Sequence, residues 1–192
     1  MNEKQLRTYR HFTRDEPLVY CPDGDERIFL AMGCFWGAER LMNSLKGVDM
    51  TSVGYTGGYE RSPTYKSVCS GETGHAETVC VTFNPKIITL EEIFKVFWEN
   101  HDPTQRNRQH NDIGTQYRSA IFCETKEQVL KAKESRENYQ ETLRKNGVDK
   151  KIVTDVNILT EYYFAEDYHQ QYLIKNKHGY CGLKGLGVSC PL

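Results

Sequence analysis

The order of its predicted elements places the chain in the α/β (α+β) class, with a ferredoxin-like split βαβ core, additional helices and a long glycine-rich C-terminal tail. Residues 27–32, apolar after the first, are too few for a helix and predict a buried strand. One helix face is predicted by the spacing of Ala38, Leu41, Met42 and Leu45. Through residue 123 the order is strand-helix-strand-strand-helix-strand, which is that of the split βαβ motif, and a further helix and strand follow.

Capping and turn signals set the bounds of the other elements. Gly47 lies just past the first helical face, where a left-handed residue would end that helix. Thr89 begins a capping-box pattern, and Thr125 caps a long charged helix that runs to about residue 146. The remaining expectations are strands at 48–55, 76–83, 119–123 and 152–159, a connection with a helix over 162–175, a glycine- and tyrosine-rich loop over 54–65 and an irregular polar segment over 105–116.

Composition bounds the partners and the compartment. The chain has 192 residues, 25 Lys and Arg against 26 Asp and Glu, and seven cysteines. Because this charge is balanced, we expect no nucleic-acid partner and no acidic membrane. No apolar run approaches the ~20 residues that span a bilayer. The N-terminus lacks an apolar signal region and carries acidic residues, so we expect a cytoplasmic monomer with reduced thiols.

No internal repeat or second domain is visible, so residues 1–192 are predicted to form one domain. Within it we expect an N-terminal arm over 1–25 with one short helix, a core over 26–175 and a flexible tail over 176–192.

Cys34 falls in the turn between the first strand and the first helix, next to Phe35 and Trp36. Unpaired N–H groups at a helix start favour a thiolate, so we expect this position to lower the pKa of the thiol. Gly33 and Gly37 would let a substrate approach closely. The pattern predicts a nucleophile beside an apolar pocket. The competing interpretation is a buried, inert cysteine with core aromatics.

Glu77 lies on the same face of its predicted strand as Val79, Val81 and Phe83. A carboxyl group on an apolar face must be neutral or paired. The pattern therefore predicts a general acid with a raised pKa. The alternative is a glutamate at a frayed strand end that reaches solvent.

Two cysteines, Cys181 and Cys190, lie in the glycine-rich terminal segment. Packing does not account for them there, and a flexible segment could carry a thiol to a distant partner. From chain order we expect Cys181 to react first with an oxidised Cys34, and Cys190 to open the resulting bond.

Three classes of function compete for these residues. His75-Ala76-Glu77 matches the start of a zinc deaminase signature, but the chain contains no Cys-x-x-Cys. A cysteine hydrolase needs a base near the thiol, and five histidines, at 75, 101, 110, 169 and 178, leave that class open. Thiol redox chemistry, in which a sulfenic acid condenses with a second cysteine, uses every feature at once.

The chain also resembles the A-type peptide methionine sulfoxide reductases from about residue 26 to the C-terminus. The resemblance is carried by Gly33-Cys34-Phe35-Trp36-Gly37-Ala38-Glu39, Gly74-His75-Ala76-Glu77, Asn111-Asp112-Ile113-Gly114-Thr115-Gln116-Tyr117-Arg118 and Gly179-Tyr180-Cys181-Gly182. It implies an α/β fold around a ferredoxin-like core, a catalytic domain over 1–192 with a redox tail over 176–192, and reduction of the S epimer of methionine sulfoxide, free or in oxidised proteins.

The resemblance also implies a role for each site residue and no metal or organic cofactor. Cys34 is the nucleophile, Glu77 protonates the sulfoxide oxygen, and Cys181 and then Cys190 pass the oxidation to thioredoxin. The substrate contacts implied are the methyl pocket of Phe35 and Trp36, hydrogen bonds from Tyr65 and Tyr117 to the oxygen, and Asp112 on the substrate backbone.

Overall fold

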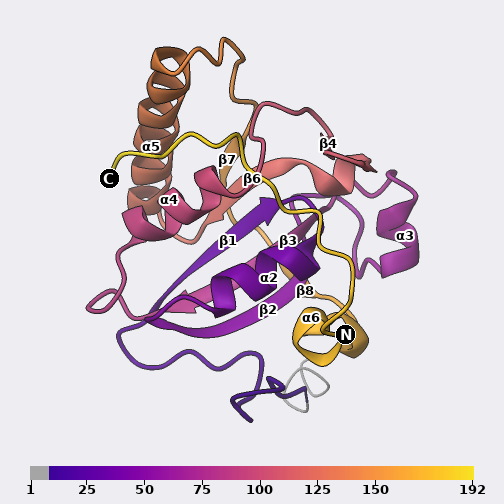
Figure 1. Ribbon diagram of the computed structural model, residues 1–192. Coiled ribbons are helices and arrows are strands. Elements are labelled where there is room, and N and C mark those ends of the chain that lie inside the picture. The colour runs from indigo at the N-terminus through magenta and orange to yellow at the C-terminus, as the bar shows by residue number, and fades with distance from the viewer. Residues whose placement is uncertain (1–8) are drawn as a thin grey trace.

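The computed structural model describes residues 9–192 and is built on a six-stranded sheet in the order β7-β6-β1-β3-β2-β8 (Figure 1). Its strands are β1 (Glu26–Met32), β2 (Val48–Thr56), β3 (Ala76–Phe83), β6 (Ser119–Cys123), β7 (Asp155–Ile158) and β8 (Tyr162–Phe164). The helices are α2 (Phe35–Asn43), α3 (Tyr65–Cys69), α4 (Leu90–Glu99), α5 (Lys126–Lys145) and α6 (Tyr172–Lys175). Shorter pieces are the strands β4 (Arg108–Gln109) and β5 (Asp112–Ile113) and the 3₁₀ turns η1 (Thr115–Tyr117) and η2 (Asp167–His169).

The four central strands confirm the ferredoxin-like core. The pairs β6–β1, β1–β3 and β3–β2 are all antiparallel, and α2 and α4 are the two crossover helices of the split βαβ motif. The appended strands occupy the two edges, β7 parallel to β6 and β8 antiparallel to β2.

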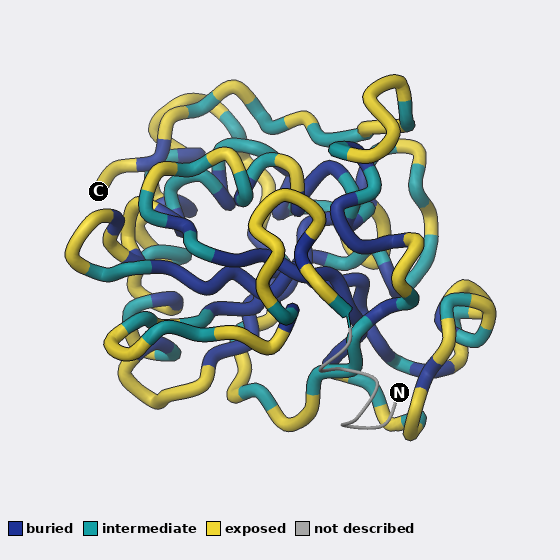
Figure 2. Tube along the Cα trace, turned by 90° about the horizontal axis from the view of Figure 1, so that it is seen from below, coloured by how far each residue is buried: buried dark blue, intermediate teal, exposed yellow. Residues whose placement is uncertain are grey.

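Both faces of the sheet are covered, which is why β3 and β6 are buried throughout and β1 and β2 are buried over most of their length (Figure 2). In β1, Ile28, Leu30 and Met32 enter the main core with α2, α4 and α5, whereas Phe29 and Ala31 pack on the opposite face against Tyr162. A strand buried on both faces is apolar without alternation, as the run over 27–32 is.

Several predicted bounds hold, and five local features differ. A capping box at Thr89 begins α4, and a side-chain cap at Thr125 begins α5, as expected. α2 ends at Asn43 with Ser44 as its C-cap, before the left-handed Gly47 that was expected to end it. The glycine- and tyrosine-rich loop contains α3, the polar segment contains the β4–β5 hairpin, and the connection after 159 contains β8. The predicted short helix of the arm is absent from residues 9–25, and the rest of the arm lies outside the described residues. None of the helices in residues 9–192 is long and apolar enough to cross a membrane.

The C-terminal tail has no regular structure, but it is anchored along its length. It runs from α6 past α4 to end beside α5 (Figure 1). The backbone N–H of Cys190 donates to Glu99 Oε1 at 2.8 Å, and Tyr139 Oη donates to the carbonyl of Val188 at 3.0 Å. Cys190 is only 2% exposed, so packing does account for this cysteine, contrary to the expectation above. Cys181 is exposed.

Gly185 permits this anchoring because a Cβ at its position would lie 1.7 Å from the carbonyl oxygen of Glu99. We therefore expect Gly185→Ala to lift the tail and expose Cys190, speeding its modification by a thiol reagent by about tenfold or more through local opening. Mass mapping of the labelled cysteine gives the rate. Ser189→Ala, at an exposed tail position, should leave that rate unchanged. Equal labelling of Cys190 in both variants would contradict the proposed close contact.

Candidate active site

Cys34 is the N-cap residue of α2, at the turn where β1 leaves the sheet. Gly33 precedes it with φ +97°, and a Cβ there would lie 2.8 Å from Gln109 Cγ, so only glycine fits both the backbone and the neighbour. The predicted strand-to-helix turn is confirmed. Cys34 is partly exposed.

Glu77 is the second residue of β3 and is 2% exposed. Its Oε2 accepts a hydrogen bond of 3.0 Å from the backbone N–H of Phe35, the first residue of α2. Burial raises the pKa of Glu77 to about 8, the Phe35 N–H opposes the rise, and the Asp112 charge adds to it. The predicted burial and raised pKa are confirmed. At neutral pH the group carries a proton in most molecules.

The predicted pKa of Cys34 is wrong in direction. Backbone N–H groups of Trp36 and Gly37 do lower it, as a helix start should. Burial of the thiol and the nearby Glu77 carboxylate raise the pKa more, so its net position lies well above the ordinary range for cysteine. The resting site therefore holds a neutral thiol beside a carboxyl that is mostly neutral.

Tyr65, at the start of α3, and Tyr117, at the end of η1, reach the same site from separate loops. Burial is the largest cause of a raised pKa in both, and the charges of Glu77 and Cys34 act on both. Each phenol thus keeps its proton and can donate it in a hydrogen bond. The structure brings Cys34, Glu77, Tyr65 and Tyr117 together.

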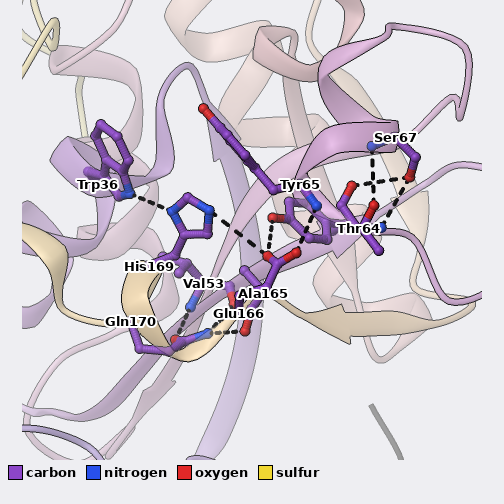
Figure 3. A network of polar contacts seen from close by, with 10 residues as sticks. Trp36, Val53, Thr64, Tyr65, Ser67, Ala165, Glu166, His169 and Gln170 are labelled. Atoms are coloured by element: carbon purple, nitrogen blue, oxygen red, sulfur yellow. Dashed lines mark hydrogen bonds and ion pairs between the residues drawn. The ribbon is translucent and has the colours of Figure 1, made fainter.

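Phe35 and Trp36 differ in their surroundings. Phe35 is buried in the main core, with its ring centroid 5.9 Å from that of Tyr55. Trp36 is partly exposed and stacks on Tyr172 with centroids 4.1 Å apart and planes at 20°. Its Nε1 donates to His169 Nδ1 at 3.1 Å (Figure 3). The Trp36 ring is therefore fixed in place while part of it remains accessible.

His169 and Glu166 belong to this site. From the sequence, His169 was named only as one of five possible bases of a hydrolase, and Glu166 was not singled out. Glu166 accepts a hydrogen bond of 2.9 Å from the Tyr65 backbone N–H (Figure 3). It also accepts one of 2.9 Å from Tyr55 Oη. Burial lowers the pKa of His169 to about 4, so this imidazole is neutral. The sequence offered one signal for these residues, the polar run 166–171. The partners of this run lie far away in the sequence, so the run alone did not indicate a site.

Asp112, in β5, and Cys181, in the C-terminal tail, lie where the start of the tail passes the site. Tyr180 Oη donates to Asp112 Oδ2 at 3.3 Å, which ties the start of the tail to β5. Cys181 Sγ lies over the first turn of α2, 2.9 Å from where a Cβ on Gly37 would stand. Cys190 does not join this group, because it is buried beside α4.

Two observations bear on the other classes of function. Within residues 9–192, no histidine nitrogen is hydrogen-bonded to Cys34, and His169 Nδ1 already accepts from Trp36. In the same residues, no group of three or more His, Cys, Asp and Glu side chains is placed to hold a metal ion.

The protein is an α+β protein with a ferredoxin-like sheet. Its candidate active site is built around a cysteine thiol at a helix start, beside a buried carboxyl. A sequence model described as “Peptide methionine sulfoxide reductase” matches residues 26–186. The chain is 57% identical over 171 residues to the “Mitochondrial peptide methionine sulfoxide reductase” of Bos taurus, across 89% of this chain and 73% of that protein. The chain therefore belongs to the peptide methionine sulfoxide reductase family.

Solved structures agree. “Methionine sulfoxide reductase A of Corynebacterium diphtheriae” superposes with a TM-score of 0.83 at 42% identity, across 89% of this chain and 83% of that one. Mxr1 from Saccharomyces cerevisiae, solved in complex with Trx2, superposes with a TM-score of 0.57 at 28% identity, across 86% of this chain and 91% of that one.

The raised pKa of Glu77 predicts how the chemical step depends on pH. If the protonated carboxyl donates the proton, single-turnover reduction should hold below about pH 8 and fall above it, as the acid form is lost. Glu77→Gln should slow that step by roughly 10²–10⁴-fold and abolish the fall. Glu72→Gln, at an exposed loop carboxyl, is the matched control. A Glu77→Gln rate within about threefold of wild type would leave the residue with a structural role only.

Proposed function

We propose that this protein reduces the S epimer of methionine sulfoxide, free or in oxidised proteins, to methionine through Cys34, with thioredoxin as the final reductant. Family membership supports the reaction, and the complex of the yeast relative Mxr1 with Trx2 supports the reductant. The observation that carries the proposal is the Glu77 carboxyl, which bonds to the Phe35 N–H directly beside Cys34.

The chemical step needs a nucleophilic sulfur and a proton at the same place. Sulfoxide oxygen leaves poorly unless it is protonated. Glu77 supplies that proton while the Cys34 sulfur attacks, and the Cys34 thiol proton finally restores the carboxyl. The balance is one thiol and one sulfoxide in, one sulfenic acid and one methionine out. Since both groups start neutral, the carboxyl proton goes to the sulfoxide oxygen and the thiol proton replaces it, so no external acid is needed.

The surrounding side chains fit the rest of the substrate. Tyr65 and Tyr117 would donate hydrogen bonds to the sulfoxide oxygen, where negative charge develops. Phe35 and the accessible part of Trp36 would take the terminal methyl group, and Asp112 would orient the substrate backbone. Their meeting around Cys34 and Glu77 supports these roles.

The tail cysteines would complete the cycle in chain order. Cys181, over the first turn of α2, condenses with the Cys34 sulfenic acid and releases water. Cys190 then attacks Cys181, which frees the Cys34 thiol and leaves a Cys181–Cys190 disulfide. A thioredoxin dithiol reduces that bond. The burial of Cys190 means that the tail must leave Glu99 before this second exchange.

We also propose that residues 1–192 act as one catalytic domain, with the arm over 1–25, the core over 26–175 and the redox tail over 176–192. The protein would work as a cytoplasmic monomer. The odd number of cysteines, seven, leaves at least one unpaired in a single chain, which fits a reducing compartment.

Thiol counting tests the proposed function directly. One equivalent of methionine S-sulfoxide, added without reductant, should convert two thiols of each molecule to a disulfide and yield one methionine. Cys34→Ser should yield none, because serine cannot form a sulfenic acid. A hydrolase or a metal enzyme would lose no thiols. Methionine formation by Cys34→Ser would show that another cysteine is the nucleophile.

Removal of Cys190 tests the order of the relay. Cys190→Ser should still release one methionine and should accumulate the Cys34–Cys181 disulfide, while turnover with thioredoxin falls. Cys181→Ser should instead leave a longer-lived sulfenic acid on Cys34. Peptide mapping after a single turnover identifies the bond. A Cys34–Cys190 disulfide as the first product of the wild-type enzyme would reverse the order.

A further inference from the structure

Between β8 and α6 the chain makes a turn that residue type alone disfavours. Gln171 has φ +50°, a left-handed conformation that non-glycine residues seldom adopt. We call residues 165–172 the clamp segment. Gln171 is 1% exposed, so its strained backbone is held inside the protein and not at a free surface loop.

One carboxylate holds this turn. Glu39, in α2, is 1% exposed, and its Oε2 accepts from the Gln171 backbone N–H at 2.7 Å. Its Oε1 accepts from Gln171 Nε2 at 2.8 Å and from Thr51 Oγ1 at 3.3 Å. Glu39 thus grips both the backbone and the side chain of the strained residue. No step of the proposed reaction uses it.

Two residues of the clamp segment on either side of Gln171, His169 and Tyr172, contact the Trp36 side chain. His169 accepts the hydrogen bond from Trp36 Nε1, and Tyr172 stacks on the Trp36 ring. Because Gln171 lies between these two, its backbone conformation sets the direction in which each of them points. Glu39 and Trp36 are themselves on α2, three residues apart. The clamp segment therefore packs back on the helix that begins at the active site.

The clamp segment is also attached to β2, at a point separate from the contact with Glu39. Gln170 binds the Val53 backbone from both sides, accepting at 2.9 Å and donating at 2.8 Å, so the segment stays on β2 in any event. That attachment does not fix the turn that follows it. Gln171 has two further contacts: its Oε1 accepts from the Phe12 N–H at 3.1 Å, and its Nε2 donates to the Thr51 carbonyl at 3.4 Å. Glu39 is the partner that bonds both the backbone N–H and the side chain of the left-handed residue.

We propose that Glu39 is a positioning residue: it holds Gln171 in the left-handed turn, and so holds His169 and Tyr172 against Trp36 in the substrate pocket. The substrate role of Trp36 rests on the function proposed above. The position of the Trp36 ring does not depend on that function and can be measured without turnover.

The test compares Glu39→Gln with Thr51→Val. Glu39→Gln keeps the shape but turns an amide N–H toward one of the two Gln171 donors. Thr51→Val removes another buried bond of the same carboxylate and keeps the Thr51 carbonyl, which accepts from Gln171 Nε2 at 3.4 Å. For Glu39→Gln we expect KM for methionine sulfoxide to rise about tenfold with kcat within about threefold, the signature of lost substrate binding. Thr51→Val should leave KM within about twofold.

Trp36 fluorescence gives a readout independent of activity. The emission of Trp36 is obtained by subtracting the spectrum of the matching Trp36→Phe protein, which removes the contribution of Trp98. It should shift in Glu39→Gln and not in Thr51→Val. An unchanged KM and unchanged Trp36 emission in Glu39→Gln would overturn the proposal, as would an equal rise of KM in Thr51→Val. If the wild-type protein failed to reduce methionine sulfoxide, the proposed function would fail, while the emission comparison would still decide the positioning.

A pair of Gln171 variants keeps the test decisive if Glu39→Gln does not fold. Gln171→Ala and Gln171→Gly lose the same side-chain hydrogen bonds and differ in the strain of the left-handed backbone, which glycine relieves. Gln171→Ala should therefore raise KM and shift Trp36 emission more than Gln171→Gly does. An equal effect of the two would show that the backbone turn does not place Trp36.

Discussion

The site depends on one hydrogen bond, from the backbone N–H of Phe35 to the carboxyl of Glu77. It joins the second residue of β3 to the first turn of α2, where the N–H groups have no partner within the helix. The same contact satisfies a buried carboxyl that would otherwise be costly to bury. Because Cys34 immediately precedes Phe35, the bond also fixes the distance between the thiol and the carboxyl. Fold and chemistry therefore share a single constraint, and a change in the β3 register would remove both.

Burial outweighs the helix start in setting the charges of this site. The N–H groups of Trp36 and Gly37 favour a Cys34 thiolate, but desolvation raises the pKa of the thiol more strongly, and the charge of Glu77 raises it further once that carboxyl has ionised. The same desolvation keeps Glu77 protonated at neutral pH. Two anions side by side would each raise the pKa of the other, so the site is stable as a neutral pair. A sulfoxide, whose oxygen accepts a proton as its sulfur is attacked, is the kind of substrate that such a pair can serve.

The features that were predicted correctly from the sequence are those that depend on residues close together in the chain. The turn at Cys34, the capping of α4 and α5, and the burial of Glu77 follow from local spacing and alternation. The features that it missed depend on distant partners. Cys190 is buried because Glu99, 91 residues earlier, receives its N–H, and Glu166 bonds to Tyr65 across 101 residues. The direction of the Cys34 pKa failed for the same reason, since a helix end is visible in the sequence and tertiary burial is not.

The two tail cysteines are held in unlike environments, and this difference would give the proposed relay its direction. Cys181 lies exposed over Gly37, one helical turn from Cys34, and needs little movement to meet a sulfenic acid. Cys190 is buried against α4, and Gly185, between the two cysteines, lies against the Glu99 carbonyl. The tail therefore cannot deliver Cys190 until these contacts are released. A bond between Cys34 and Cys181 would draw the start of the tail toward the site and pull on them. In the proposed relay the first exchange would thus prepare the second, and an exposed disulfide would form only after the nucleophile has reacted.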